Sequence, residues 1–146
     1  MRVSLILLLC IPTLSFSQLK VSNGIDSQNS SFPIVSKTGV ATILYDRSEN
    51  ILVKKAATFL AGDIEAVSGK RPNISTTINS LGNYAIIVAT VGNNSLIAKL
   101  AAEKKINIDA LKGQWERFVV QTVDRPFPGI QKALVIVGSD RRGAAY

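Results

Sequence analysis

Ten carboxyl side chains are the residues of this 146-residue chain best suited to acid–base chemistry. A glycosidase needs two carboxyl groups that converge across a cleft, one to protonate the leaving oxygen and one to act on water or on the sugar. Asp63 and Glu65 lie two positions apart on a predicted helix, so their side chains diverge. The full set is Asp26, Asp46, Glu49, Asp63, Glu65, Glu103, Asp109, Glu116, Asp124 and Asp140.

Helix and strand ends account for most of the other carboxyl groups. Asp46, Glu49 and Asp140 stand where predicted helices begin, and helix capping explains an acidic residue there. Glu116 and Asp124 bracket a predicted strand. No pair stands out, so the sequence predicts no catalytic residue in this chain.

Histidine is missing from the chain, and its one cysteine, Cys10, lies in an N-terminal apolar stretch. The lack of histidine excludes the usual acid–base residue at neutral pH, the Ser-His-Asp triad and the common zinc ligands. Once the N-terminal stretch is removed, no thiol remains for nucleophilic catalysis or metal binding. The sequence therefore predicts neither a metal site nor a cofactor.

Two glycine-containing segments could hold a phosphate or another anion. Gly69-Lys70 lacks the preceding glycine and the following Ser or Thr of a phosphate-binding loop, and it follows a predicted helix, so a helix C-cap is favoured. Val91 to Ser95 joins a buried strand to a helix N-terminus, where backbone N–H groups can bind an anion. It lacks the further glycines of a dinucleotide site, so a plain turn with an Asn cap is favoured.

The positive charge of the chain suits acidic partners such as nucleic acid, anionic lipid or a polysaccharide that contains uronic acid. The net charge is +7 and falls by one when Arg2 is removed. The basic residues are scattered singly or in pairs without interleaved aromatics, which argues against nucleic acid. Trp115 could stack on a sugar ring, but its place at a strand edge favours a core anchor. No substrate-binding residue can be assigned from these patterns.

The first 17 residues have the pattern of a cleavable signal peptide. Arg2 provides the positive charge, Val3 to Leu14 form an apolar stretch, and small residues precede a cut after Ser17. This apolar stretch is shorter than the roughly 20 residues that cross a bilayer, so no membrane span is expected. A lipoprotein signal at Cys10 is the weaker alternative, because no small residue precedes it suitably. The sequence predicts export to the periplasm or the extracellular space, with residues 18–31 as a flexible lead-in.

The remaining residues, 32–146, alternate strand and helix patterns. Residues 32–35 and 40–45 are typical of a hairpin, 73–78 of a polar strand, and 84–90, 117–123 and 133–137 of further strands. A capping box at Asp46 to Glu49 predicts a helix that ends at Gly69, and a second helix begins near Asn94. The first helix should bury a stripe of apolar side chains, namely Leu52, Ala56, Phe59, Leu60, Ile64 and Val67.

This alternation predicts an α/β domain, a small two-layer or three-layer sandwich around a mixed sheet. A single helical turn is expected at residues 109–113. At the C-terminal end, Ser139-Asp140 predicts the start of another helix, and the chain ends about six residues later. A helix that short is not stable alone, so further sequence is expected to follow Tyr146.

The segment from Ala133 to Tyr146 resembles a step found in several glycoside hydrolases. A strand is followed there by D-R-R-G-x-x-Y, here Asp140 to Tyr146. Together with Tyr84 to Ile97 and Trp115 to Phe118, it is most similar to glycoside hydrolase family 115, the xylan α-1,2-glucuronidases. Related N-terminal domains of hexosaminidases and other α-glucuronidases have similar sequences at this step.

This resemblance covers residues 32–146 and implies an N-terminal domain that precedes a (β/α)8 barrel. In the family the barrel supplies the catalytic carboxylates and the sugar pocket, and no position of this chain matches a family catalytic residue. The resemblance therefore implies a non-catalytic domain of an exported enzyme that removes glucuronic acid or 4-O-methylglucuronic acid from xylan. The alternative is a stand-alone secreted module that binds acidic polysaccharide.

Overall fold

The computed structural model describes residues 31–37 and 39–146 of the chain. The predicted signal peptide over residues 1–17, and the predicted lead-in except for Ser31, lie outside these residues. Within the described part, no helix is long and apolar enough to cross a membrane.

A five-stranded sheet forms the centre of the domain, in the order β4-β3-β5-β7-β6. The first four strands in this order are parallel to their neighbours, and the edge strand β6 is antiparallel to β7. The predicted α/β fold with a mixed sheet is therefore confirmed. The strands are β3 (Thr42–Leu44), β4 (Ile74–Ser75), β5 (Tyr84–Thr90), β6 (Phe118–Asp124) and β7 (Lys132–Gly138).

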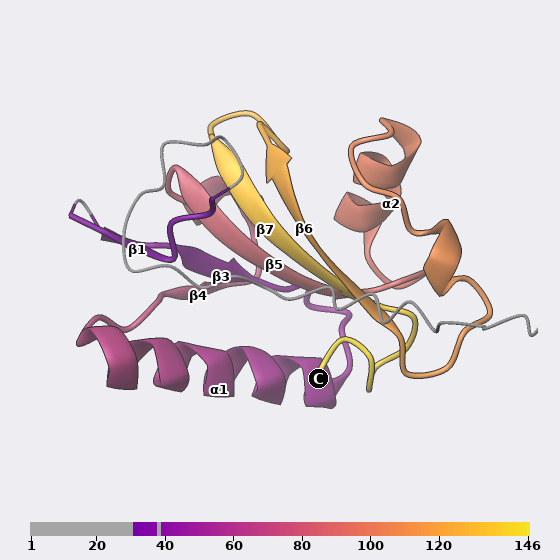
Figure 1. Ribbon diagram of the computed structural model, residues 1–146, viewed down its shortest axis with the longest axis horizontal. Helices are drawn as coiled ribbons and strands as arrows, with labels where there is room; N and C mark the ends of the chain where they lie inside the picture. The colour runs from indigo at the N-terminus through magenta and orange to yellow at the C-terminus, as the bar shows by residue number, and fades with distance from the viewer. Residues whose placement is uncertain (1–30, 38) are drawn as a thin grey trace, which may run out of the picture.

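Helices cover both faces of the sheet, which makes a three-layer sandwich (Figure 1). Helix α1 (Ile51–Ser68) lies on one face and α2 (Ser95–Ala102) on the other. In β5, Ile86 and Val88 pack with the α1 side, whereas Ala85, Ile87 and Ala89 pack with the α2 side. The apolar run of β5 is unbroken because the strand is buried on both faces, as its sequence predicted.

The N-terminal strands differ from the predicted hairpin. In this part of the described chain, β1 (Val35–Ser36) and β2 (Gly39–Val40) pair antiparallel and form a separate small sheet. β3, which was expected in that hairpin, is instead a parallel strand between β4 and β5. The predicted polar strand over 73–78 is shortened to β4, because the chain turns into the 3-10 helix η1 (Ile78–Ser80).

Helix α1 does not begin at the predicted capping box of Asp46 to Glu49. Its N-cap is the next residue, so this prediction was wrong. Asn50 is the N-cap, and its side chain accepts the N–H of Leu52. Asp46 caps the preceding turn instead, where Ser48 N and Oγ both donate to its Oδ1. Gly69 ends the helix in the left-handed conformation, as predicted.

The buried face of α1 also differs from the predicted apolar stripe. Val53, Ala57 and Ala61 are fully buried, whereas Phe59 is 70% exposed and Val67 is 91% exposed. Alanine side chains let the helix approach the sheet closely, and larger side chains on that face would hold it away. Ile64 of the predicted stripe is buried and Leu60 packs against the same core, so the prediction was right for these two residues and wrong for Phe59 and Val67. Helix α1 has apolar residues around most of its circumference, so periodicity placed the buried stripe partly on the wrong side.

The later elements agree with the sequence predictions. Asn94 caps α2, whose Ile97 and Leu100 are buried, and the 3-10 helix η2 (Asp109–Leu111) provides the expected single turn. β6 and β7 form where two strands were predicted.

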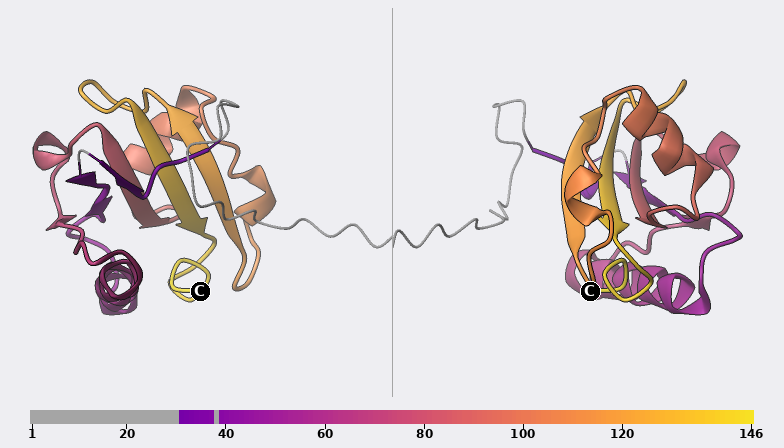
Figure 2. Two further views of the ribbon diagram at one scale, coloured as in Figure 1. Left: turned by 60° about the vertical axis from the view of Figure 1, so that its left-hand side comes forward. Right: turned by 90° about the vertical axis from the view of Figure 1, so that its right-hand side faces the viewer.

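The C-terminal residues 139–146 form a turn beside α1 rather than the start of a regular helix (Figure 2). Asp140 caps it as predicted, because its Oδ1 accepts the N–H groups of Arg142 and Gly143. Ala144 is buried in the same cluster as Val53. The turn thus completes the core on the α1 face.

Candidate functional site

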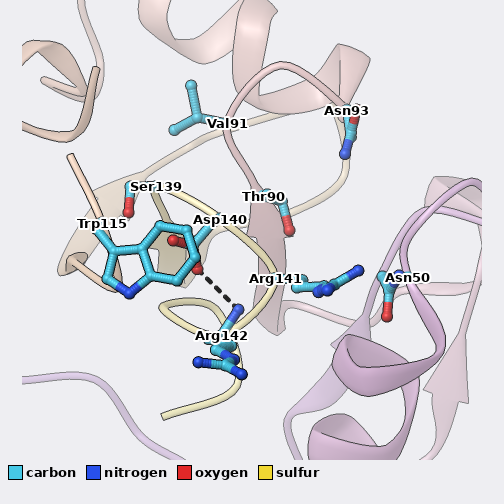
Figure 3. Close-up of a pocket in the computed structure, with 9 residues that line it drawn as sticks. All are labelled: Asn50, Thr90, Val91, Asn93, Trp115, Ser139, Asp140, Arg141 and Arg142. Atoms are coloured by element: carbon cyan, nitrogen blue, oxygen red, sulfur yellow. Dashed lines mark hydrogen bonds between the residues drawn. The ribbon is translucent and has the colours of Figure 1, made fainter. Parts of the chain in front are cut away.

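A cleft of about 460 Å³ lies where the carboxyl ends of β5 and β7 meet the N-terminus of α1 (Figure 3). Its walls come from the N-cap of α1, the β5–α2 turn, the loop before β6 and the turn after β7. Ligands of open parallel sheets bind at this edge, outside the carboxyl ends of the strands. The lining residues are Asn50, Thr90, Val91, Asn93, Trp115, Ser139, Asp140, Arg141 and Arg142.

The loops after β3 and β5 are tied together at one side of the cleft. The chain leaves β3 for α1 on one face and leaves β5 for α2 on the other, so this is where the topology switches direction. Glu49 is buried and accepts the backbone N–H of Thr90 at 2.8 Å and its hydroxyl at 2.9 Å. Ser48 Oγ, which donates to Asp46, also lies 3.0 Å from Asn93 O. Glu49 therefore fixes the wall of the cleft, a role that the capping interpretation missed.

Trp115 is not the core anchor that the sequence favoured. Its side chain is 74% exposed at the rim of the cleft. The guanidinium carbon of Arg142 lies 5.9 Å from the centre of a ring of the indole, within the range of a cation–π contact. The next residue, Glu116, has φ +53°, a left-handed conformation that turns the chain between Trp115 and β6.

Backbone contacts hold the loop of Trp115 against the turn after β7. Ser139 N donates to Arg117 O at 2.7 Å, and Arg117 N donates to Ser139 Oγ at 3.0 Å. Glu116 N donates to Asp140 Oδ2 at 2.8 Å. These contacts join segments more than 20 residues apart, so the sequence pattern gave no signal of them.

Some charged side chains of the cleft have hydrogen-bond or ion-pair partners in the described part of the chain, and one does not. Arg142 Nη1 donates to Glu116 Oε1 at 2.7 Å, and this hydrogen bond raises the pKa of the guanidinium. The backbone N–H of Glu116, with smaller contributions from Gly143 and Arg142, holds the pKa of Asp140 below its ordinary value of 3.8. Arg141 has no hydrogen-bond or ion-pair partner among the described residues and extends toward Asn50. Arg141 is thus the charged side chain of the cleft left without a partner among these residues, and the ionised carboxylate of Asp140, held by backbone N–H groups, lies in the same cleft.

The depressed pKa of Asp140 predicts a stability change in acid. A carboxyl group whose pKa is lower in the folded chain stabilises the fold above its unfolded pKa, and this stabilisation is lost as the pH falls through the folded pKa. We expect the free energy of unfolding to fall between about pH 5 and pH 2, and Asp140→Asn to flatten that dependence. Urea unfolding measured at several pH values checks this. Asp46 and Glu103, whose pKa values are also lowered, should supply the rest of the pH dependence. If the free energy of unfolding of Asp140→Asn depends on pH as steeply as that of the unchanged chain, the prediction is wrong.

None of the carboxyl groups with a clearly shifted pKa is a suitable proton donor. Hydrogen bonds from Ser48 lower the pKa of Asp46, and the hydrogen bond with Lys105 lowers that of Glu103. A general acid at neutral pH needs a shift in the opposite direction. The structure brings Glu116 and Asp140 together, which the sequence did not predict, but Arg142 and backbone N–H groups occupy them.

The two glycine-containing segments occupy different places. Gly69 is a helix C-cap, and Lys70 Nζ donates to Ser36 O, away from the cleft. The β5–α2 turn has Gly92 at φ +86° and contributes Asn93 to the cleft. Across residues 31–37 and 39–146, no three Asp, Glu, Cys or His side chains gather in a way that could hold a metal ion.

Comparison with known proteins gives an informative likeness to a solved structure. No family model matches the chain, and no curated protein matches it significantly. Among solved structures, BtGH115A, described as a family GH115 4-O-methyl-α-glucuronidase with specificity for decorated arabinogalactans, matches with a TM-score of 0.57 and 30% sequence identity. The chain is related to a GH115 enzyme.

The extent of this match is unequal between the two proteins. It covers 73% of this chain but only 12% of the GH115 chain. The relationship to GH115, expected from Ala133 to Tyr146 together with Tyr84 to Ile97 and Trp115 to Phe118, is thus confirmed. It links this chain to one small part of a much longer glycoside hydrolase.

Proposed function

We propose that residues 32–146 are a non-catalytic N-terminal domain of an exported α-glucuronidase. The observation that carries this proposal is the match of most of this chain to about one eighth of a GH115 enzyme. The parent would remove glucuronic acid or 4-O-methylglucuronic acid from xylan through a catalytic barrel that follows this domain. Decorated arabinogalactan, named for BtGH115A, is the second substrate to test.

Exposed apolar surface supports a role beside another domain. Phe59 and Val67 project from the outer side of α1 with 70% and 91% of their surface exposed. Phe118 on β6 is 49% exposed, on an edge of the sheet. These side chains are available for contact with a further domain.

The purified 146-residue chain is expected to release no uronic acid from glucuronoxylan or from decorated arabinogalactan. The pKa values of Asp46, Glu103 and Asp140 are lowered, which is the wrong direction for a general acid, and Glu116 and Asp140 are engaged as described above. Released uronic acid, measured by chromatography against a boiled control, checks this. Turnover that disappears in Glu116→Gln would contradict the non-catalytic role.

A stand-alone secreted module for acidic polysaccharide is the second candidate. The net positive charge and the cleft with Arg141 and Trp115 favour it. The coding region downstream of the Tyr146 codon separates the two candidates. An open frame that encodes a (β/α)8 barrel supports the enzyme domain, and an immediate stop codon supports the module.

A further inference from the structure

We propose that the cleft at the carboxyl ends of β5 and β7 binds an acidic saccharide, with Trp115 stacked on a sugar ring and Arg141 paired with its carboxylate. This inference deepens the second proposed function and does not depend on the activity of any parent enzyme. A domain of an α-glucuronidase could hold its polysaccharide in the same way.

The placement of Trp115 is the first observation. An exposed tryptophan leaves a large apolar surface in water, and most of this indole is open to solvent. Its position is nevertheless fixed, because Ser139 and Asp140 hold the two residues that follow it. Glu116 adopts its left-handed conformation at this point, and local strain of this kind gathers at ligand sites. A fixed, exposed aromatic ring is a platform for stacking.

The free charge of Arg141 is the second, independent observation. Glu116 compensates Arg142, and three backbone N–H groups engage Asp140, whereas Arg141 has no partner among the described residues. The peptide dipoles at the N-terminus of α1, whose first turn contains no acidic residue, also face this side of the cleft, and the carboxylate of Glu49 directly before the N-cap is engaged by Thr90. An arginine in this setting can bind a carboxylate through two parallel hydrogen bonds.

The other groups of the cleft suit sugar hydroxyls better than bases. The side-chain amides of Asn50 and Asn93 line it and offer hydrogen bonds to hydroxyl groups. The cleft, about 460 Å³ in volume, is open to solvent on one side, so a sugar could lie in it while the rest of the polymer stays outside. Among the described residues, Trp115 is the one aromatic side chain that lines the cleft, whereas sites for single-stranded nucleic acid usually stack several bases on several rings. A carboxylated sugar therefore fits the cleft better than an oligonucleotide.

The test compares the binding of the purified 146-residue chain to glucuronoxylan and to the same polysaccharide after its carboxyl groups have been reduced. We expect retardation in native gels that contain glucuronoxylan and free migration in the reduced polymer. Trp115→Ala and Arg141→Ala should each weaken binding about tenfold. Phe59→Ala removes an equally exposed aromatic and Lys55→Ala removes an exposed charge, both on the outer side of α1, and neither should change binding.

Three results would overturn the proposal. One is equal retardation in native and reduced polymer. Another is a loss of affinity in Lys55→Ala as large as that in Arg141→Ala, because binding would then depend on the net charge of the chain and not on the cleft. The third is tighter binding of an oligonucleotide that depends on Trp115. Thermal unfolding followed by circular dichroism confirms that each variant is folded, and Trp115→Phe, which keeps a stacking ring, should retain most of the binding. None of these outcomes bears on whether a catalytic barrel follows the domain.

Discussion

Replacing Gly138 with alanine is expected to lower the free energy of unfolding by about 3 kcal/mol, because the new methyl group has no room. A Cβ atom there would overlap Ala144 N and lie 2.5 Å from Gly143 C and 2.6 Å from Ala144 Cα. These are backbone atoms of the C-terminal turn, which cannot move aside as a side chain can. The turn would have to leave the core that it shares with α1. Urea unfolding followed by circular dichroism measures the loss.

Gly82→Ala is the matched control for this substitution. A Cβ at Gly82 meets no atom within 4 Å, so we expect a change within about 0.5 kcal/mol. Equal stability of Gly138→Ala and Gly82→Ala would show that the turn after β7 does not pack on the strand end. Gly138→Ala should also displace Arg141 and Arg142, and so weaken binding of acidic saccharide.

Removing the carboxyl group of Glu49 is expected to cost about 2–3 kcal/mol of stability. Backbone N–H groups of successive residues in a strand point to opposite sides. Val91 N donates to Gly138 O on the β7 side, so the N–H of Thr90 points toward β3. β3 has already ended at Leu44, and Glu49 supplies the missing acceptor. In Glu49→Ala this buried N–H has no partner, and the Thr90 hydroxyl loses its acceptor as well.

Two further variants separate this role from a general effect of charge. Glu49→Gln keeps an acceptor for the N–H of Thr90 and should lose less stability than Glu49→Ala. Glu65→Ala breaks an exposed ion pair with Arg71, for which a loss within about 1 kcal/mol is expected. Equal losses in Glu49→Ala and Glu65→Ala would contradict the proposed link between β3 and β5.

Local patterns along the chain determined most of the elements of this protein. β5 was predicted with its observed bounds, because an apolar run of seven residues between turn residues can be satisfied only by burial on both faces. The caps at Gly69 and Asn94 were also predictable, since they depend on residues within one helical turn. The segment from Ala133 to Tyr146, together with Tyr84 to Ile97 and Trp115 to Phe118, further indicated the relationship to GH115.

Tertiary structure alone decided which faces are buried and where the functional groups meet. Helix α1 is apolar on two sides, so only the shape of the sheet selects Val53 and Ala57 over Phe59 for burial. Glu49 resembled a cap because its partner, Thr90, lies 41 residues away. Trp115 resembled a core residue because the contacts that hold its loop outward come from Ser139 and Asp140. Contacts between distant segments leave no periodic signal, so the cleft that these residues form became visible only when the chain was folded.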